Sequence, residues 1–506
     1  FKINNFKKAK YFLHEVVKKD PNDAISLFNL HTFYFETGDY NSSCKYLVQA
    51  YSLDNNNFTF NSALAEIYLN NYFNGRTFDI NNINIDYNSG SFDKNYSPTD
   101  LDKCKFHFDK INKIDLTYLH KNYTYIMYLF IHRETEKAIQ YLKNYITNLN
   151  FSDMEEIGSK ISAYLFLLLH SENFTTDYIF KEHVKFGQIF ENQLKDFKKK
   201  YQNIPEINKT LKVGFVSKDF RDHPAKSPIL SIWKNLKNFN IEIHAFNNAR
   251  SVNYSLCGDF KKYIHKWYDV FDLKDVQLAD FIFKKQIDIL IDLSGHTDGN
   301  RLLTFAQKPA PIQISCIGYP GTTGLKNIDY ILCDERIAPK NIYDHLYVEK
   351  MLRIPSAAAW TPPFNSPKVK TLPALKNKYI TFGSFNYPRK ITKKSIRAWS
   401  QILLKIPNSV LVQAAVDSHS IKENLIKEFE ENGIHEERIK FIPRLKNKEL
   451  QQYLTDNIDI CLDNTMYTGG TTTNHALWMG VPVVTLRGEN RVQGQSASCL
   501  EHIGLN

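Results

Sequence analysis

The sequence predicts an α/β fold of two parallel-sheet domains preceded by an all-α repeat region, and three observations support this prediction. The first part of the chain repeats a helical pattern at a fixed offset. From Leu211 short apolar strands alternate with helical segments, and a second set of strands begins at Tyr379. We therefore predict a helical domain at 1–205, sheet domains at 206–353 and 378–506, and a linker at 354–377.

The repeat has an offset of 34 residues, since Phe6 recurs as Tyr40 and the segment 20–23 recurs at 54–57. This period is typical of tetratricopeptide helix pairs. A degenerate third copy lies at 136–142, whereas 71–115 is rich in Asn, Asp, Gly and Ser and is expected to be an insertion or long loop. Such a region either binds peptides on a concave surface or has only a structural role beside the catalytic domains.

Two sets of strands follow the repeats. The first set is expected at 212–217, 241–246, 287–293 and 312–317, and the second at 379–385, 458–463 and 481–486, with a Pro-rich segment at 354–373 between them. Two such sheets facing a cleft form the GT-B arrangement. Ligands are then expected at the carboxyl ends of the strands.

A Gly-Thr-rich segment, 468–473, lies between the predicted strand 458–463 and a short helix that continues through 476–479. The threonines can cap this helix, and its free amides and positive dipole end favour a phosphate or diphosphate. The alternative is a Thr-rich helix cap without a ligand. The segment alone does not choose between them.

Composition argues against several classes of protein. The net charge is +10 over 506 residues, and no basic block indicates nucleic acid. The seven cysteines form no Cys-x-x-Cys pair, so neither a disulfide framework nor zinc is indicated. No apolar run approaches the roughly 18 residues of a membrane span. We expect a cytoplasmic protein, cut at both ends because Phe1 lies inside a helical pattern and the chain stops at Asn506 just after another begins.

From 212 onwards the sequence resembles glycosyltransferase family 41, the SPINDLY and O-GlcNAc transferase group. Six segments follow one another in the family order: Ser-Lys-Asp-Phe-Arg-Asp-His-Pro at 217–224, Asp-Leu-Ser-Gly-His-Thr at 292–297, Pro-Ala-Pro-Ile-Gln at 309–313, Gly-Tyr-Pro-Gly-Thr at 318–322, Phe-Gly-Ser-Phe-Asn at 382–386 with Lys390, and Gly-Gly-Thr-Thr-Thr at 469–473. One such segment is a weak signal, whereas the ordered set is specific.

The resemblance implies inverting transfer of a sugar from a nucleotide sugar to Ser or Thr hydroxyls of proteins, without a metal or resident cofactor and with the repeats guiding the acceptor protein. It implies that Lys390 contacts the diphosphate and that His223 lies in the active site as a base or a positioning group. Asp269 matches a carboxylate proposed for proton handling, and His296 is interpreted as lining the cleft. The residues implied to bind the donor are Gly318, Tyr319, Pro320, Asn386, Lys390, Gly470, Thr471, Thr472 and His475.

Two positions depart from the family pattern. Leu450 stands where family members usually carry a histidine that contacts the nucleotide, and His475 stands where an acidic residue holds the ribose hydroxyls. A carboxylate accepts two hydrogen bonds from a diol, whereas neutral histidine offers one acceptor. The resemblance implies UDP-GlcNAc as the donor, and because of these two departures GDP-fucose and UDP-glucose stay alternatives. The alternative function from another class is that of a peptide-binding scaffold, in a homologue with weakened catalysis. A GT-B nucleotide-sugar epimerase is disfavoured by the repeats and by the segment 318–322.

Overall fold

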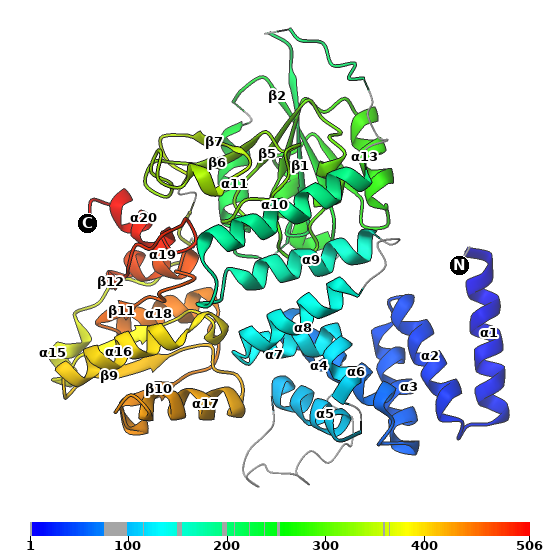
Figure 1. Ribbon diagram of the computed structural model, residues 1–506, viewed down its shortest axis with the longest axis horizontal. Helices are drawn as coiled ribbons and strands as arrows, with labels where there is room; N and C mark the ends of the chain where they lie inside the picture. Colours follow the sequence, from blue (N-terminus) through cyan, green and yellow to red (C-terminus); the bar gives the residue numbers. More distant parts are fainter. Residues whose placement is uncertain are drawn as a thin grey trace. The chain divides into compact units, whose positions relative to one another are not determined.

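The computed structural model describes residues 3–74, 99–114, 116–148, 154–194, 200–206, 208–221, 223–236, 238–249, 254–357, 360–363 and 365–505 (Figure 1). The chain divides into two compact units. One comprises Phe1–Tyr141 and Val416–Leu425, and the other Leu142–Ala415 and Ile426–Asn506. None of the helices in the described ranges combines the length and the apolar character that crossing a membrane requires.

The first unit is helical. Its helices are α1 Ile3–Lys19, α2 Ala24–Glu36, α3 Tyr40–Leu53, α4 Phe58–Asn74, α5 Asp100–Ile114, α6 Leu116–Lys121, α7 Tyr123–Ile131 and the first half of α8 Thr135–Thr147. The predicted repeat appears here as two helix pairs, α1 with α2 and α3 with α4. Asp23 accepts a hydrogen bond from Ile25 N (3.0 Å) at the start of α2, and Asn57, 34 residues later, accepts one from Thr59 N (3.0 Å) at the start of α4.

Helix α5 corrects the expectation that 71–115 is a loop throughout. Leu101, Cys104, Phe108 and Ile111 recur every three or four residues and are buried, which is the apolar stripe of a core-facing helix. His107 of the same helix is also buried, and its Nδ1 lies 2.8 Å from Asn61 Oδ1 of α4. The rest of the expected insertion, 75–98, lies outside the described residues.

The second unit contains two parallel sheets. The first has the strand order β3-β2-β1-β4-β5-β6-β7 and the second has the order β10-β9-β8-β11-β12. The strands of the first are β1 Leu211–Ser217, β2 Ile241–Asn247, β3 Lys266–Asp269, β4 Ile289–Asp292, β5 Ile312–Ser315, β6 Tyr330–Cys333 and β7 Lys350–Arg353. Those of the second are β8 Thr381–Ser384, β9 Val410–Gln413, β10 Ile439–Phe441, β11 Ile460–Leu462 and β12 Val483–Val484.

Helices connect these strands. Those of the first sheet are α11 Lys226–Leu236, α12 Tyr254–Lys261, α13 Asp275–Lys284 and α14 Leu302–Ala306. Those of the second are α15 Pro373–Asn377, α16 Lys393–Lys405, α17 His419–Glu430, α18 Asn447–Asn457, α19 Thr471–Trp478 and α20 Gln495–His502. Trp233 of α11 is fully buried against Phe215 of β1 and Phe220, which anchors the helix on the sheet.

Two further helices, α9 Met154–Leu168 and α10 Thr176–Gln193, belong to the compact unit that holds the sheets (Figure 1). The sequence placed them in the helical domain 1–205. Helix α10 lies so close to the loop at Gly324 that a Cβ on Gly187 would be 1.9 Å from Gly324 O. Helix α9 contacts the same domain through Ser162 Oγ, 3.1 Å from His296 Nδ1. This helical hairpin is therefore part of the frame around the candidate site.

Candidate active site

Both sheets have their topological switch point beside the first strand of the domain. The order reverses between β1 and β4 in the first sheet and between β8 and β11 in the second. Ligands of open parallel sheets bind outside the carboxyl ends of the strands at such points. The segments that follow these four strands contain most of the residues that the sequence singles out.

His223 lies in the loop after β1. Its Nδ1 accepts a hydrogen bond from Ala225 N (3.2 Å) and lies 3.7 Å from Asp219 Oδ2. Because Nδ1 accepts from a backbone amide, the neutral ring carries its proton on Nε2. The imidazole is about one-third exposed. In this form His223 can donate a hydrogen bond to a substrate.

Asp269 ends β3 at the same sheet edge and is exposed. The register pairs Ser217 of β1 with Asn247 of β2, and Asn247 with Asp269. Asp269 Oδ1 accepts hydrogen bonds from Asn247 Nδ2 (2.9 Å) and Trp267 Nε1 (2.8 Å). The carboxylate is therefore held at the edge that also carries the His223 loop.

The loop 317–324 follows β5 and contains Gly318, Tyr319 and Pro320. Its backbone is constrained at the start, since Ile317 has φ +69°, a left-handed conformation that is unfavourable for a β-branched residue. A Cβ on Gly318 would lie 2.1 Å from Leu293 O, so only glycine fits there. Such strain is typical of functional loops that the surrounding structure holds in place.

Buried polar side chains hold this loop from its inner face. Glu349 accepts hydrogen bonds from Thr322 Oγ1 (2.6 Å) and Thr323 N (2.7 Å), and burial raises the pKa of its carboxyl. Tyr347 donates from its hydroxyl to Pro320 O (2.6 Å). His183 Nε2 of α10 lies 2.7 Å from the Tyr319 hydroxyl. The sequence analysis missed these supports, because an isolated Glu or His carries no local signal of the loop it contacts.

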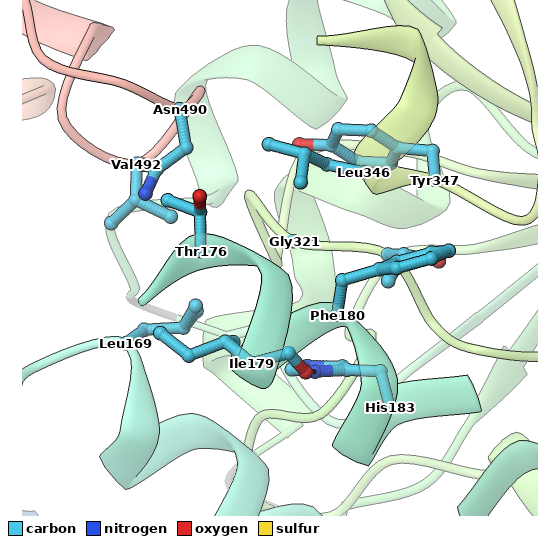
Figure 2. A pocket seen from close by; sticks show the side chains of 11 residues that line it. Leu169, Thr176, Ile179, Phe180, His183, Gly321, Leu346, Tyr347, Asn490 and Val492 are labelled. Atoms are coloured by element: carbon cyan, nitrogen blue, oxygen red, sulfur yellow. Dashed lines mark hydrogen bonds between the residues drawn. The ribbon is translucent and has the colours of Figure 1, made fainter. Parts of the chain in front are cut away.

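A small pocket lies next to the side chains that hold the loop 317–324 (Figure 2). The pocket is bounded by α10, the loop at Gly321 and the 3-10 helix η3 Asp344–Leu346. Most of its lining is apolar, and His183 and Tyr347 reach it from opposite sides in the view of Figure 2. Both ring nitrogens of His183 are already partnered, Nδ1 by Ile179 O (2.7 Å). The pocket therefore reflects packing behind the loop rather than a polar binding site.

His296 was expected to line the cleft, and the structure corrects this expectation. The side chain is 2% exposed. Its Nε2 lies 2.9 Å from Thr323 O and its Nδ1 lies 3.1 Å from Ser162 Oγ. Burial lowers the pKa of the ring well below its ordinary value, so it is neutral. His296 therefore joins α9 to the loop 317–324.

The Gly-Thr-rich segment forms the start of α19, but the threonines do not cap it. Gly470 is the N-cap residue and no side-chain capping bond is present. Thr472 Oγ1 instead donates to Asn386 Oδ1 (3.2 Å), and Thr473 Oγ1 lies 2.7 Å from Ser496 Oγ. Among the described residues, no side chain accepts a hydrogen bond from the first-turn amides of α19, which begin at Thr471. Free amides at a helix start are groups that can bind an anion.

Asp463, directly after β11, organises this helix start. Its Oδ1 accepts from Gly469 N (2.9 Å) and Asn386 Nδ2 (3.1 Å), and its Oδ2 accepts from Thr485 Oγ1 (2.9 Å). Burial raises the pKa of its carboxyl. The sequence analysis treated Asp463 only as the end of a strand. Its position at the carboxyl end of a buried strand was the signal available for finding it.

Lys390 lies beside the same cluster, at the end of the 3-10 helix η4 Pro388–Lys390. Burial, reinforced by the neighbouring Arg389, lowers its pKa from 10.5 to about 8, with Asp463 acting in the opposite direction. Its Nζ lies 4.3 Å from the centre of the Tyr467 ring. With the described residues it forms neither an ion pair nor a hydrogen bond. A cation without a bound carboxylate beside free helix amides is an arrangement suited to an anionic ligand.

The two departures from the family pattern lie on neighbouring helices. His475 of α19 is 3% exposed, and its Nδ1 lies 3.2 Å from Gln451 Nε2 of α18. The edge of Trp360 packs against the imidazole, with ring centroids 5.4 Å apart. Burial lowers the pKa of His475, so the ring is neutral. Leu450 packs into the hydrophobic cluster of this domain, and the Oε1 of the adjacent Gln451 is buried without a hydrogen-bond partner.

Within the described ranges, the structure contains no group of three or more His, Cys, Asp or Glu side chains placed to hold a metal ion.

Comparison with known proteins places the chain in a family. The model of the family described as "Glycosyl transferase family 41" matches residues 184–359 and 368–506. The Arabidopsis thaliana "Probable UDP-N-acetylglucosamine--peptide N-acetylglucosaminyltransferase SPINDLY" is 32% identical over 345 residues, which cover 65% of this chain and 36% of that protein. The Arabidopsis thaliana protein of the same description with the name SEC is 30% identical over 290 residues, which cover 55% of this chain and 29% of that protein.

A solved structure gives the fold. The O-GlcNAc transferase of Thermobaculum terrenum, solved as a mutant, aligns with a TM-score of 0.69 at 23% identity, covering 97% of this chain and 81% of that chain. This likeness confirms the predicted arrangement of tetratricopeptide-like helices followed by a GT-B pair of sheets. The chain spans about a third of the length of the SPINDLY relatives it matches.

Proposed function

We propose that this chain, a member of glycosyltransferase family 41, transfers a sugar from a nucleoside diphosphate sugar to Ser or Thr hydroxyls of proteins. The observation that carries the proposal is that Asp463 both acts on the charge of Lys390 and holds Gly469, directly before the uncapped start of α19. Breaking the bond between the anomeric carbon and the diphosphate oxygen leaves a growing negative charge. Preorganised donors at that place stabilise the transition state.

The proposed step is an inverting displacement without a metal. The acceptor hydroxyl oxygen forms the new bond to the anomeric carbon while the bond to the diphosphate breaks. Lys390 and the amides from Thr471 onwards receive the charge of the diphosphate, and Asn386 aligns the helix start through Thr472. Gly318, Tyr319 and Pro320 form the wall on the sugar side in this proposal. The strained backbone at Ile317 supports it, because the loop is held in one conformation.

His223 and Asp269 act on the acceptor side in this proposal. The tautomer inferred for His223 favours hydrogen-bond donation from Nε2 to a substrate oxygen, which is a positioning role. Asp269 keeps one carboxylate oxygen fixed by two N–H donors, which leaves Oδ2 to accept a proton at the same sheet edge.

The donor is proposed to be UDP-GlcNAc, because the SPINDLY and SEC relatives are described as probable transferases that use that sugar nucleotide. His475 stands where the family has a carboxylate for the ribose; it is buried in the ligand-free structure, and once uncovered it would offer a single hydrogen bond. GDP-fucose and UDP-glucose therefore stay alternatives. The acceptor is proposed to be a protein guided by the helical repeats of the first unit, in the cytoplasm, without nucleic acid or membrane partners.

The second candidate function is a peptide-binding scaffold with weakened catalysis, which the burial of His475 behind Trp360 favours. The experiment that separates the two has two parts. Calorimetric titration of the chain with UDP, GDP and their sugars identifies the donor. Mass spectrometry of a protein acceptor incubated with that donor detects transfer. Nucleotide binding with transfer supports the enzyme, whereas absence of both in the folded chain supports the scaffold.

A further inference from the structure

Tyr467 contacts both the ammonium of Lys390 and His170, a buried histidine in the turn after α9. One face of its ring is 4.3 Å from Lys390 Nζ. The ring of His170 stacks on Tyr467, with centroids 4.4 Å apart and planes inclined by 20°. His170 is 3% exposed, and its Nδ1 lies 3.0 Å from Phe166 O of the preceding helical turn. The three side chains therefore form one column of contacts, from His170 on the helical hairpin through Tyr467 to Lys390.

The hairpin also contacts the two sheet domains at separate places. Glu172 Oε1, in the loop between α9 and α10, accepts a hydrogen bond from Lys394 N (3.0 Å) at the start of α16. On the other side, Ser162 and His183 contact His296 and Tyr319 of the first sheet domain. The hairpin thus spans from the loop 317–324 to the side chain of Lys390.

Resting on the proposed function, we propose that Tyr467 and His170 are positioning residues for Lys390, holding its ammonium ready for the diphosphate of the donor. The aromatic face attracts the cation electrostatically without using its N–H groups. A carboxylate in the same place would bind those N–H groups and compete with the ligand. The carboxylate of Asp463, which is close enough to affect the pKa of Lys390, is already occupied by N–H and O–H donors.

The charge state of His170 fits this role. Burial lowers the pKa of its imidazole well below the ordinary value, and the charges of Lys390 and Arg389 lower it further. With Nδ1 directed at Phe166 O, the neutral ring carries its proton there. A neutral ring can stack on Tyr467 and support it, whereas a protonated one would repel the nearby ammonium of Lys390.

The test is a double-mutant cycle on the full chain. Tyr467→Phe keeps the ring face and is expected to bind UDP like the wild type, because the hydroxyl has no part in the column. Tyr467→Leu removes the face and is expected to weaken UDP binding and donor turnover about tenfold, on the scale of a desolvated cation–π contact. In the Lys390→Ala background Tyr467→Leu is expected to have no further effect.

His132 provides a matched control for His170. It is buried too, its Nδ1 lies 3.1 Å from the carbonyl four residues earlier, and its ring centroid lies 3.9 Å from that of Tyr128, but it belongs to the first unit. Because Lys390 acts on the charge of His170 but not on that of His132, we expect His170→Leu to weaken UDP binding several-fold and His132→Leu to leave it unchanged. If Tyr467→Leu does not fold, the comparison of these two histidine variants carries the test.

The outcomes separate the two proposals. UDP binding by the wild type with equal affinity in Tyr467→Leu, or an additive loss in the Lys390→Ala background, would overturn the positioning role and leave the proposed function standing. Equal losses in His170→Leu and His132→Leu would do the same, since they would report general destabilisation. A folded wild-type chain that binds neither UDP nor GDP overturns the proposed function and this inference with it.

Discussion

The depressed pKa of Lys390 predicts how nucleotide affinity changes with pH. In the proposed site Lys390 attracts a diphosphate only when protonated, and burial lowers its pKa to about 8 in the ligand-free protein. A bound diphosphate stabilises the ammonium and raises this pKa towards the ordinary 10.5. Affinity is therefore fully present below pH 8 and falls by up to tenfold per unit as the pH rises above it.

The size of the fall in nucleotide affinity follows from the shift in the pKa of Lys390. The difference 10.5 − 8 is 2.5 units, which corresponds to about 300-fold in affinity or about 3.4 kcal/mol at about 1.36 kcal/mol per unit. This is an upper bound, because the half-buried ammonium remains partly screened by solvent. We expect a fall of between tenfold and 300-fold between pH 8 and pH 10.5.

Calorimetric titration of UDP across this range is the assay, with Lys390→Met as a control of similar length. The variant is expected to bind weakly and with almost no pH dependence over the same range, and Lys390→Ala is expected to lower donor turnover by about two orders of magnitude. A flat affinity curve for the wild type, or the same fall in Lys390→Met, would refute the assignment of Lys390 to the diphosphate.

Three further predictions concern the loop, the repeats and the nucleoside side of the site. Gly318→Ala is expected to lower the free energy of unfolding by about 3 kcal/mol in thermal unfolding, because the added Cβ meets Leu293 O. Gly258→Ala, in α12 with open space around it, is expected to raise the free energy of unfolding by up to about 1 kcal/mol. Similar effects of both changes would argue against the close approach at Gly318. Deleting 1–150 is expected to spare UDP binding and donor hydrolysis, because α9 and α10 remain, but to impair transfer to whole proteins. Loss of UDP affinity in a folded truncated chain would contradict this prediction. His475→Asp is expected to tighten UDP binding about tenfold in titrations, because a carboxylate accepts charge-assisted hydrogen bonds from the ribose hydroxyls. Weaker binding by this variant would mean that the histidine is adapted to this pocket.

The sequence predicts the elements whose signals are local. The 34-residue offset predicts two helix pairs, and the turn residues Asp23 and Asn57 occupy the same place in each. Short β-branched runs predict the buried strands, although β5 ends at Ser315 rather than at Ile317 because the backbone turns left-handed there. Helix α5 was missed because the polar composition of 75–98 dominated the interpretation of the whole segment.

What the sequence cannot predict is which distant side chain supports a functional segment. Glu349 holds the threonines of the loop 317–324, and His170 supports the tyrosine beside Lys390, yet neither lies near its partner in the chain. Periodicity describes only how a residue relates to its immediate neighbours, so contacts of this kind carry no local signal. They decide the geometry of the site all the same, because a lysine on a flexible stem stabilises charge only when its ammonium is held in place beforehand. The candidate site is therefore a property of how α9 and α10 pack on two sheets, and the variants at His170 and Tyr467 test that packing rather than the motif.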